Sequence, residues 1–473
     1  MTDQRPVRIG ADEVTTPDAM EVRSPYDDHL IGVVPRCSPA HVAVAIATAR
    51  ARLAEGMAPW QRAEILQRAV QVVADHREEL ARIIAEEAAK PIKTARVEAE
   101  RTTITFQAAA DEARTLAGDM VPIDGFSPGA GKLAFTLRVP RGVVAAISPF
   151  NFPLNLVAHK LAPAIAAGCP VVLKPASQTP LSAIRLHELL MDECGLPAGW
   201  INIVTGSGGT VGDPLVESPD VAVITFTGSP PVGWAIAAKA PRKKVGLELG
   251  NNAPVIIDAS GDWQAAAAKI SVAGFSHAGQ SCISTQRIYV HTAIADAFTA
   301  ALVERVAALK VGDPLDEDTD VSALIHPDET TRVKRWIDDA VSEGAQVATG
   351  GGQHDRLLDP TVLTGITADM DVSRHEVFGP MVGIATFDAL DDALARANDT
   401  DYGLQAALFT TDLDVALRAA HELDFGGVLV NEVPTFRTDQ MPYGGVRDSG
   451  NTKEGPHYAV REMTRERLVI IQR

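Results

Sequence analysis

The sequence predicts an α/β protein built around a parallel sheet. From residue 142 to residue 260, short apolar runs alternate with amphipathic segments of helical length. Strands that are apolar along their whole length are typical of a parallel sheet covered by helices on both faces. The chain has 473 residues, and at roughly 100 to 200 residues per domain this length predicts two to four domains.

The first part of the chain is predicted to be helical. Residues 38–54 form a helix capped by Ser38, about 60–90 a longer amphipathic helix, and 93–117 a third, because apolar residues recur at helical spacing. Glycines and prolines then surround short alternating runs in residues 118–142, which is typical of a β-hairpin.

Strands and helices alternate from residue 142 onward. The predicted strands are residues 142–148, 170–175, 201–206, 221–228 and 253–260, and the predicted helices are 153–168 and 182–195. A second α/β unit is predicted from about 265 to 435. The final run, residues 466–473, resembles a strand but has no partner nearby in the sequence.

The composition disfavours nucleic acid and membranes as partners. The formal net charge is −18, and such a surface repels nucleic-acid phosphates and anionic lipids. The amino terminus MTDQRPVRIG lacks the apolar core of a signal peptide. Prolines and charged residues interrupt the most apolar region, residues 142–173, so we do not expect it to span a membrane.

The cysteines indicate a reducing environment. They are Cys37, Cys169, Cys194 and Cys282, without CxxC spacing. This pattern predicts neither a disulfide framework nor a zinc site, and no His/Cys/Asp cluster has the spacing of metal ligands. We therefore expect a cytoplasmic protein without a metal.

Cys282 lies in an unusual context, FSHAGQSCIST (residues 275–285). A buried structural cysteine usually packs among Leu, Ile and Val. A nucleophilic cysteine needs access to its substrate and a backbone that can approach closely. The small and polar neighbours favour the second interpretation, although this window alone leaves both open.

Two segments are candidates for binding a cofactor. FTGSPPVG (residues 226–233) ends a strand and opens a helix, so Gly228 and Gly233 could let a phosphate approach the helix N-terminus. The spacing is not GxGxxG, and a plain strand-to-helix turn is the alternative. Lys174 ends a predicted parallel strand, where ligands bind open sheets; the alternative is a solvated lysine.

Three further polar residues are candidates for chemistry. Glu248 lies in an apolar context, where poor solvation would raise its pKa and suit a general base; the alternative is an ion pair with Lys243 or Lys244. Asn151, on a turn in SPFNFPLN, could donate to an oxyanion, or simply stabilise the turn. Glu376 in HEVFGP could hold a ribose or be a surface carboxylate.

The order of these motifs is more specific than any one of them. FNFP, LKPASQTP, FTGSxxVG, LELGxNAP, GQxC, EVFGP and PYGGVRDSG, read in this order, resemble the aldehyde dehydrogenase superfamily over nearly the whole chain. The separation of 34 positions (282 − 248) between Glu248 and Cys282 is similar to the family's usual one. The resemblance is strongest to the lactaldehyde and non-phosphorylating glyceraldehyde-3-phosphate dehydrogenase-like branch.

The resemblance implies a reaction at Cys282. The cysteine attacks the aldehyde, and the Asn151 amide and the Cys282 N–H hold the oxyanion. Hydride transfer to the nicotinamide then gives a thioester, and Glu248 activates the water that hydrolyses it. The product is the carboxylate of a short-chain aldehyde, such as lactaldehyde or glyceraldehyde 3-phosphate.

The resemblance also implies a site for NADP or NAD. Its residues are Lys174, Ser177, Gly228, Ser229, Gly233, Glu376 and Phe378. Lys174 and Glu376 would hold the riboses, Phe378 would face the nicotinamide, and the glycine-containing turn would cover the pyrophosphate.

Two positions depart from the family pattern. Ser177 stands where strongly NAD-preferring members often carry a Glu that repels a 2′-phosphate, so we expect NADP to be accepted. Asn251 stands where a second glycine is usual, and we expect a small shift of the cofactor or water pocket.

The family architecture implies a Rossmann-type cofactor domain, an α/β catalytic domain and a small β arm for oligomerisation. The boundaries would be residues 1–120 and 143–246 for the cofactor domain, 247–440 for the catalytic domain, and 121–142 with 458–473 for the arm. The arm would pair the hairpin with the terminal strand and build a homodimer or homotetramer.

The substrate tail has three candidate contacts, Arg101, His159 and Arg437. The arginines could bind a phosphate, sulfonate or carboxylate. The alternatives are a helix-surface ion pair of Arg101 with Glu98 or Glu100, and a packing role for His159. Ser276 replaces an arginine typical of succinate-semialdehyde enzymes, which disfavours that substrate.

Two other functions compete with hydrolytic aldehyde oxidation. A coenzyme A-acylating relative would pass the acyl group to a thiol, although the presence of Glu248 disfavours this. A non-catalytic dinucleotide-binding homologue is the second, and the complete set of Asn151, Glu248 and Cys282 disfavours it.

Overall fold

The computed structural model describes residues 4–472 and contains two hydrophobic cores. The first core draws on residues 7–249 together with Val460 and Met463, and the second on residues 255–433. Each core surrounds one mainly parallel sheet. The predicted α/β class is therefore confirmed.

The first sheet is entirely parallel and buried. Its order is β11-β10-β7-β8-β9. The strands are β7 (Val143–Ile147), β8 (Val171–Lys174), β9 (Ile201–Ile203), β10 (Val221–Thr227) and β11 (Lys244–Glu248). The continuous apolar runs of β7 and β8 explain their burial on both faces.

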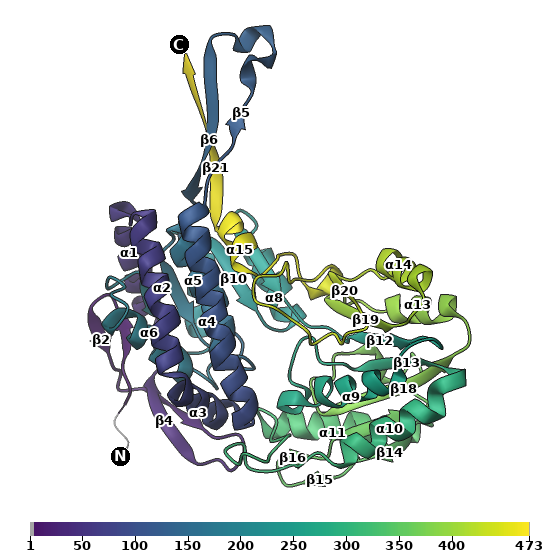
Figure 1. Ribbon diagram of the computed structural model, residues 1–473. Helices are drawn as coiled ribbons and strands as arrows, with labels where there is room; N and C mark the ends of the chain where they lie inside the picture. Colours follow the sequence, from purple (N-terminus) through teal and green to yellow (C-terminus); the bar gives the residue numbers. More distant parts are fainter. Residues whose placement is uncertain (1–3, 473) are drawn as a thin grey trace.

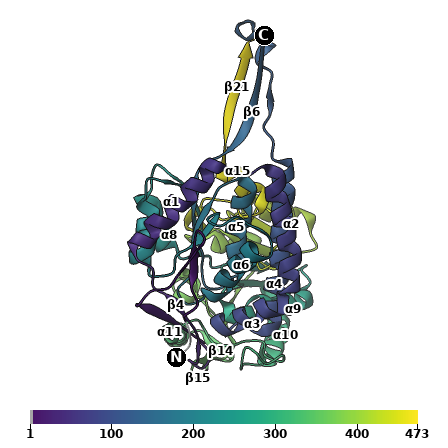
Figure 2. The same cartoon turned by 90° about the vertical axis from the view of Figure 1, so that its left-hand side faces the viewer.

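Helices cover both faces of this sheet. They are α1 (Pro39–Glu55), α2 (Pro59–Asp75), α3 (Arg77–Ala88), α4 (Ile92–Thr115), α5 (Asn155–Ala167), α6 (Leu181–Asp192), α7 (Asp213–Glu217) and α8 (Pro230–Lys239). Figure 2 shows α1 and α8 on one side and α2, α4, α5 and α6 on the other. Ser38 caps α1 as predicted, since its side chain accepts from the His41 N–H.

The second sheet has seven strands in the order β14-β17-β18-β13-β12-β19-β20. They are β12 (Pro254–Ile257), β13 (Arg287–His291), β14 (Gln346–Thr349), β17 (Thr361–Thr364), β18 (Met381–Phe387), β19 (Gln405–Phe409) and β20 (Gly427–Val430). Only β14 runs antiparallel to its neighbour. The helices of this half are α9 (Trp263–Ala273), α10 (Ala295–Ala307), α11 (Pro327–Ser342), α12 (Asp371–Arg374), α13 (Leu390–Asn398) and α14 (Leu413–Glu422).

A β arm projects from the body (Figure 1). It contains β5 (Met120–Val121), β6 (Lys132–Pro140) and β21 (Thr464–Gln472), in the order β21-β6-β5. The predicted pairing of the terminal strand with the hairpin is confirmed, with Thr464 opposite Pro140 and Gln472 opposite Lys132. The carboxyl-terminal part of the arm was predicted to begin at residue 458. However, residues up to Met463 belong to helix α15 (Pro456–Met463), which packs into the first core through Val460 and Met463.

The structure corrects three other details. The predicted helix over residues 60–90 breaks at His76, which separates α2 from α3 and bonds Glu79. Residues 7–35 form two unpredicted antiparallel pairs, β1 (Val7–Ile9) with β2 (Asp12–Val14) and β3 (Ala19–Arg23) with β4 (Leu30–Pro35). Strand β11 and the short pair β15 (Gln353–His354) and β16 (Leu357–Leu358) were also not predicted. Within residues 4–472, no helix has both the length and the hydropathy needed to cross a bilayer.

Candidate active site

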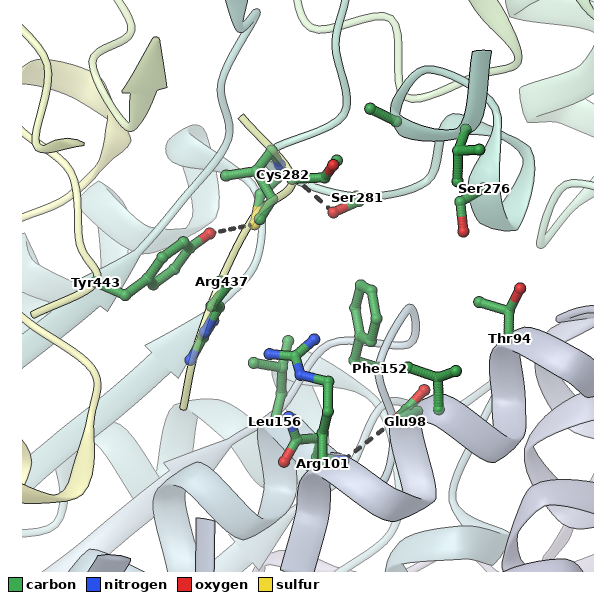
Figure 3. A pocket seen from close by; sticks show the side chains of 16 residues that line it. Thr94, Glu98, Arg101, Phe152, Leu156, Ser276, Ser281, Cys282, Arg437 and Tyr443 are labelled. Atoms are coloured by element: carbon green, nitrogen blue, oxygen red, sulfur yellow. Dashed lines mark hydrogen bonds between the residues drawn. The ribbon is translucent and has the colours of Figure 1, made fainter. Parts of the chain in front are cut away.

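Two hollows of the protein meet at Cys282. The small cavity, with a volume of about 190 Å³, lies between α4 and the loops that carry Cys282 and Arg437 (Figure 3). The large cleft, with a volume of about 830 Å³, contains residues that follow the strands of the first sheet. Cys282 and Leu156 line both. A molecule in either hollow can therefore reach the sulfur.

The large cleft lies where the order of the first sheet reverses. From β7 the chain continues outward through β8 and β9, and then returns to the other side of β7 as β10 and β11. The residues after β7 (149–151) and after β10 (228–231) line the cleft. Ligands of open α/β sheets bind at such a switch point, outside the carboxyl ends of the strands.

Cys282 follows a turn with unusual backbone angles. His277 and Ala278 have φ of 51° and 54°, the left-handed region that side chains disfavour, and Gly279 has φ of 72°. A Cβ on Gly279 would lie 2.1 Å from the carbonyl oxygen of Gly379. Glycine is therefore required at position 279 for the loop to pack.

Among residues 4–472, the Cys282 sulfur has one polar side-chain partner, the hydroxyl of Tyr443, at 2.8 Å. Burial raises the pKa of the thiol to about 12, and the hydrogen bond from Tyr443 opposes this shift. The unassisted group is therefore a thiol at neutral pH, and a nucleophilic role requires a base.

Two hydrogen-bond donors lie in the segments around the sulfur. The Asn151 amide nitrogen donates to the Gln280 carbonyl at 2.9 Å, which leaves its second hydrogen available. Among residues 4–472, the backbone N–H of Cys282 has no acceptor. These two donors can bind an oxyanion that forms on a carbon attached to the sulfur.

A buried ion pair holds the loop that carries Asn151. Lys90 pairs with Glu98, donates to the Asn151 carbonyl at 2.6 Å and lies 3.7 Å from the centroid of the Phe152 ring. Glu98 also accepts from the backbone N–H groups of Leu154 and Asn155. The pair thus fixes both ends of the turn.

Glu248, the last residue of β11, is buried, and neither carboxylate oxygen has a hydrogen-bond partner among residues 4–472. Burial raises its pKa well above the ordinary value, and the charge of Glu454 adds to this. The predicted alternative is wrong, because Lys243 donates to the carbonyls of Val216 and Ser218, and Lys244 pairs with a different carboxylate. Glu248 thus has the properties of a general base that titrates above the usual carboxylate range.

Glu376 and Phe378 line the large cleft together with Gly228 and Ser229. Burial raises the pKa of Glu376 to about 8, while its Oε1 accepts from the Asn251 N–H at 2.9 Å. Glu376 is partly buried and lines the cleft, so it is not a freely exposed surface carboxylate.

Gly250 and Asn251 adjoin Glu376. A Cβ on Gly250 would lie 2.3 Å from Glu376 Oε2, so only glycine allows this approach. The Asn251 side chain donates to the Gln405 carbonyl at 3.2 Å and does not line the cleft. The side chain of Asn251 therefore points away from the cleft and does not produce the expected shift of the pocket.

Three of the predicted cofactor residues do not line the large cleft. Lys174 is buried, and within the described part of the chain it donates only to the Pro175 carbonyl, at 3.3 Å; burial lowers its pKa to about 8. Ser177 donates to the Gly206 carbonyl at 3.1 Å and lines a neighbouring cavity. Gly233 packs α8 closely, since a Cβ there would lie 2.5 Å from Leu249.

Arg101 on α4 faces the small cavity (Figure 3). Its Nε and Nη2 bind the carboxylate of Asp439 at 3.2 and 2.8 Å, and its Nη1 has no partner among residues 4–472. The predicted alternative, an ion pair of Arg101 with Glu98 or Glu100, is not found among residues 4–472. Glu98 pairs with Lys90, and Glu100 pairs with Arg77. Arg101 can therefore donate to a molecule in the cavity.

Arg437 also lines the small cavity, but it is held more tightly. Its Nη2 donates to Glu454 at 2.8 Å, and its guanidinium carbon lies 3.9 Å from the centroid of the Tyr443 ring. His159 does not line the cavity: its Nε2 lies 2.9 Å from Asp439 and 3.0 Å from Arg437. The alternative, a buried packing role for His159, is therefore correct.

The site contains residues that sequence reasoning missed. They are Tyr443, Asp439, Glu454, Lys90 and Glu98. Tyr443 stood within the PYGGVRDSG motif, which was a usable signal. The others act through contacts between distant segments. Among residues 4–472, no group of His, Cys, Asp and Glu is placed to hold a metal ion.

Comparison with known proteins identifies the family. The model of the aldehyde dehydrogenase family matches residues 13–469. The chain belongs to the aldehyde dehydrogenase family. It is an NAD(P)-dependent aldehyde dehydrogenase, as predicted.

The similar proteins include members of the predicted branch. The 3-sulfolactaldehyde dehydrogenase of Priestia aryabhattai is 47% identical over 457 residues, covering 97% of this chain and 96% of that protein. The lactaldehyde dehydrogenase of Methanococcus aeolicus is 38% identical, covering 96% and 97%. The glyceraldehyde-3-phosphate dehydrogenase of Methanocaldococcus jannaschii, solved with NADP, has a TM-score of 0.93 at 38% identity, covering 97% of this chain and 100% of that one.

Proposed function

We propose that this aldehyde dehydrogenase oxidises a short 2-hydroxyaldehyde with a monoanionic tail, and that 3-sulfolactaldehyde is its substrate. The observation that carries this proposal is the unpartnered Nη1 of Arg101 on the wall of the small cavity that contains Cys282, among residues 4–472. The sulfonate would bind Arg101, and the aldehyde carbon would then lie toward the sulfur. Hydroxyls of Thr94, Ser276 and Ser281 line the same cavity and can donate to sulfonate oxygens.

The charge balance of the cavity supports a monoanion over a phosphate. Its charged lining residues are Arg101, Arg437 and Glu98, which pair with Asp439, Glu454 and Lys90 behind the wall. These charges cancel, so little positive excess is available to a dianion. A phosphate ester carries roughly −1.5 to −2 at pH 7, whereas a sulfonate carries a single charge.

The names of the similar proteins agree with this substrate class. The 47% identical relative acts on 3-sulfolactaldehyde, and the others act on lactaldehyde and glyceraldehyde 3-phosphate. All three aldehydes carry a hydroxyl beside the carbonyl, so they differ in the tail that the arginines would contact.

Cys282 is the proposed nucleophile. Its thiol proton passes to water, and the sulfur attacks the aldehyde carbon. The carbonyl electrons move to the oxygen, where the second Asn151 amide hydrogen and the free Cys282 N–H stabilise the charge. The carbon–sulfur bond of this thiohemiacetal holds the substrate at the junction of the two hollows.

The large cleft fits the dinucleotide that the family uses. Gly228 and Ser229 precede α8, whose dipole favours an anion at its N-terminus. Pro230 and Pro231 have no N–H, so Val232 is the first residue of α8 that can donate to a pyrophosphate. Glu376 retains Oε2 as an acceptor for ribose hydroxyls. When bound there, NADP or NAD supplies the acceptor for the hydride that leaves the thiohemiacetal carbon.

Glu248 is the proposed base for the second half of the reaction. It takes a proton from a water molecule, whose oxygen attacks the thioester carbon. The carbon–sulfur bond breaks, and the product acid loses its proton to water and leaves as the carboxylate. The protonated Glu248 returns its proton to the sulfur, so that Cys282 regains its starting state. The absence of polar partners for both Glu248 oxygens within residues 4–472 supports this role, because they remain available to water.

The role of Arg101 is tested by Arg101→Gln. We expect kcat/KM for 3-sulfolactaldehyde to fall by about 10- to 100-fold, the effect of losing a hydrogen bond to a charged group. The value for neutral lactaldehyde should change little. Arg96→Gln is the matched control, since Arg96 lies on the same helix but binds Glu78 and Glu317 at the surface. Equal losses for both aldehydes would show that Arg101 does not recognise the tail.

The cofactor preference is tested at Ser177. We propose that NADP is accepted because position 177 carries no negative charge. Ser177→Glu should lower kcat/KM for NADP by about 100-fold, since juxtaposed like charges cost several kcal/mol, and preserve the value for NAD. Ser177→Ala is the control without added charge. A wild-type enzyme that strongly prefers NAD would contradict the proposal.

We also propose a homodimer or homotetramer assembled through the β arm. Leu468, Ile470 and Ile471 on β21 and Leu137 on β6 are exposed, which supports burial against another copy. A cytoplasmic location is supported by the four cysteines, which are all free thiols.

A further inference from the structure

Tyr443 contacts the sulfur of Cys282 directly. Its hydroxyl lies 2.8 Å from Cys282 Sγ, and this is the only side-chain hydrogen bond of that sulfur among residues 4–472. Figure 3 shows the ring pointing from its loop straight toward the sulfur. None of the steps of the proposed mechanism uses this contact.

The position of the Tyr443 ring is fixed from several sides. Ile283 and Leu404 pack with it in a small apolar cluster, and the guanidinium carbon of Arg437 lies 3.9 Å from the ring centroid. Its backbone is also anchored, because the carbonyl of Tyr443 accepts from the Glu454 N–H at 2.6 Å. The hydroxyl therefore has little freedom to leave the sulfur.

We propose that Tyr443 is a further catalytic residue, whose hydroxyl donates a hydrogen bond to the Cys282 sulfur and stabilises it as the attacking thiolate. This inference rests on the proposed function, in which Cys282 is the nucleophile. It assigns to Tyr443 a task that neither Asn151 nor Glu248 performs, since those residues serve the oxyanion and the proton.

The chemistry explains why a phenol suits this position. A thiolate has no hydrogen and only accepts, so the phenol must be the donor in the reactive state. Hydrogen bonds to an ionised acceptor are roughly twice as strong as neutral ones. Tyr443 thus favours the charged sulfur in a buried site that otherwise disfavours it.

The step balances with solvent water as the proton acceptor. The thiol proton moves to water, and Tyr443 keeps its own proton throughout. A sulfur electron pair then forms the bond to the aldehyde carbon, and the carbonyl π pair moves to oxygen. As the charge leaves the sulfur, the hydrogen bond from Tyr443 weakens, while those to the new oxyanion strengthen.

The expected size of the effect follows from two opposing trends. Loss of a hydrogen bond to a charged group should raise the pKa of the Cys282 thiol by about one or more. Nucleophilicity rises with pKa at a Brønsted slope of about 0.4–0.5, which recovers part of the lost reactivity. If the thiol pKa is higher by one in Tyr443→Phe, attack by the Cys282 sulfur at a fixed pH should be about threefold slower than in the wild type.

The test is the pH dependence of Cys282 alkylation by iodoacetamide, followed on the Cys282 peptide by mass spectrometry. Three proteins are compared with the wild type: Tyr443→Phe, a protein with 3-fluorotyrosine at position 443, and Tyr289→Phe. Fluorination makes the phenol a stronger donor and preserves its hydroxyl, so this protein should fold even if Tyr443→Phe does not. Tyr289 is a buried tyrosine whose hydroxyl donates to the Arg396 carbonyl, in the second core.

The proposal predicts opposite displacements of the alkylation profile. Tyr443→Phe should move the rising limb to higher pH, and 3-fluorotyrosine should move it to lower pH, whereas Tyr289→Phe should leave it in place. Unchanged profiles in both position-443 proteins, or an equal displacement in Tyr289→Phe, would overturn it. Alkylation needs no aldehyde, so a wrong substrate assignment or an inactive Glu248 would not affect this result.

Discussion

Cys282→Ser is expected to lose aldehyde oxidation by at least about 10⁴-fold, the scale seen when a catalytic nucleophile is removed. The hydroxyl of serine is far less acidic than a thiol, and the buried position already disfavours ionisation. Binding of NADP should be retained, because Cys282 contributes only one side chain to the large cleft. Steady-state NADPH formation and cofactor titration measure the two effects separately.

Cys37→Ser is the matched control for this substitution. Cys37 is a buried free thiol with Thr205 as its neighbour at 3.8 Å, and it lines neither hollow. The Cys37→Ser variant should be somewhat less stable than the wild type but should keep its activity. Substantial turnover by Cys282→Ser, or an equal loss in Cys37→Ser, would exclude Cys282 as the nucleophile.

Glu248→Gln is expected to stop the reaction after hydride transfer. Without a base to activate water, the thioester should accumulate, with a burst of about one NADPH per subunit. Steady-state turnover should then fall by about 10²- to 10⁴-fold, the usual contribution of general base catalysis. Rapid-mixing absorbance measures the burst, and mass spectrometry of the quenched protein detects the acylated Cys282.

The wild type should also show a pH dependence that Glu248→Gln lacks. A general base acts when deprotonated, and burial followed by the charge of Glu454 raises the pKa of Glu248 well above its ordinary value. The rate of thioester hydrolysis should therefore rise with pH through that raised pKa, and should be low where Glu248 is protonated. Single-turnover decay of the thioester at a series of pH values measures this.

Two outcomes would contradict the role of Glu248. In the first, Glu248→Gln shows no NADPH burst, and its hydride transfer is as slow as its steady-state turnover. This result would mean that Glu248 acts mainly before or during hydride transfer and not in thioester hydrolysis. The other is a wild-type enzyme that turns over only when coenzyme A is added, which would favour acyl transfer to a thiol. Glu462→Gln, which removes the surface partner of Lys244, is the control and should resemble the wild type.

The α/β layout could be predicted because its strands are apolar along their length. β7 and β8 are buried throughout, so their runs stand out in the sequence. The break at His76 could not be seen, because the apolar spacing from Val73 to Leu80 is seven residues and continues the helical period across it. The pairs within residues 7–35 are short and partly exposed, and leave little periodic signal.

The site was predictable where its residues stand in motifs and not where distant segments meet. Asn151, Glu248 and Cys282 stand in motifs, and the structure brings all three to the wall of the large cleft. Lys174, Ser177 and Gly233 stand in motifs too, but their side-chain positions depend on packing against Pro175, Gly206 and Leu249. The partners of Arg101 and Arg437 come from residues 439 and 454, and no spacing rule predicts such contacts.

The most direct test of the central claim is the initial rate of NADP and NAD reduction with three aldehydes: 3-sulfolactaldehyde, lactaldehyde and glyceraldehyde 3-phosphate. They share the 2-hydroxyaldehyde and differ in a monoanionic, neutral or dianionic tail. We expect the highest kcat/KM for 3-sulfolactaldehyde, with an advantage that depends on Arg101. An equal or higher value for lactaldehyde would contradict the proposed substrate and leave Arg101 as a structural partner of Asp439.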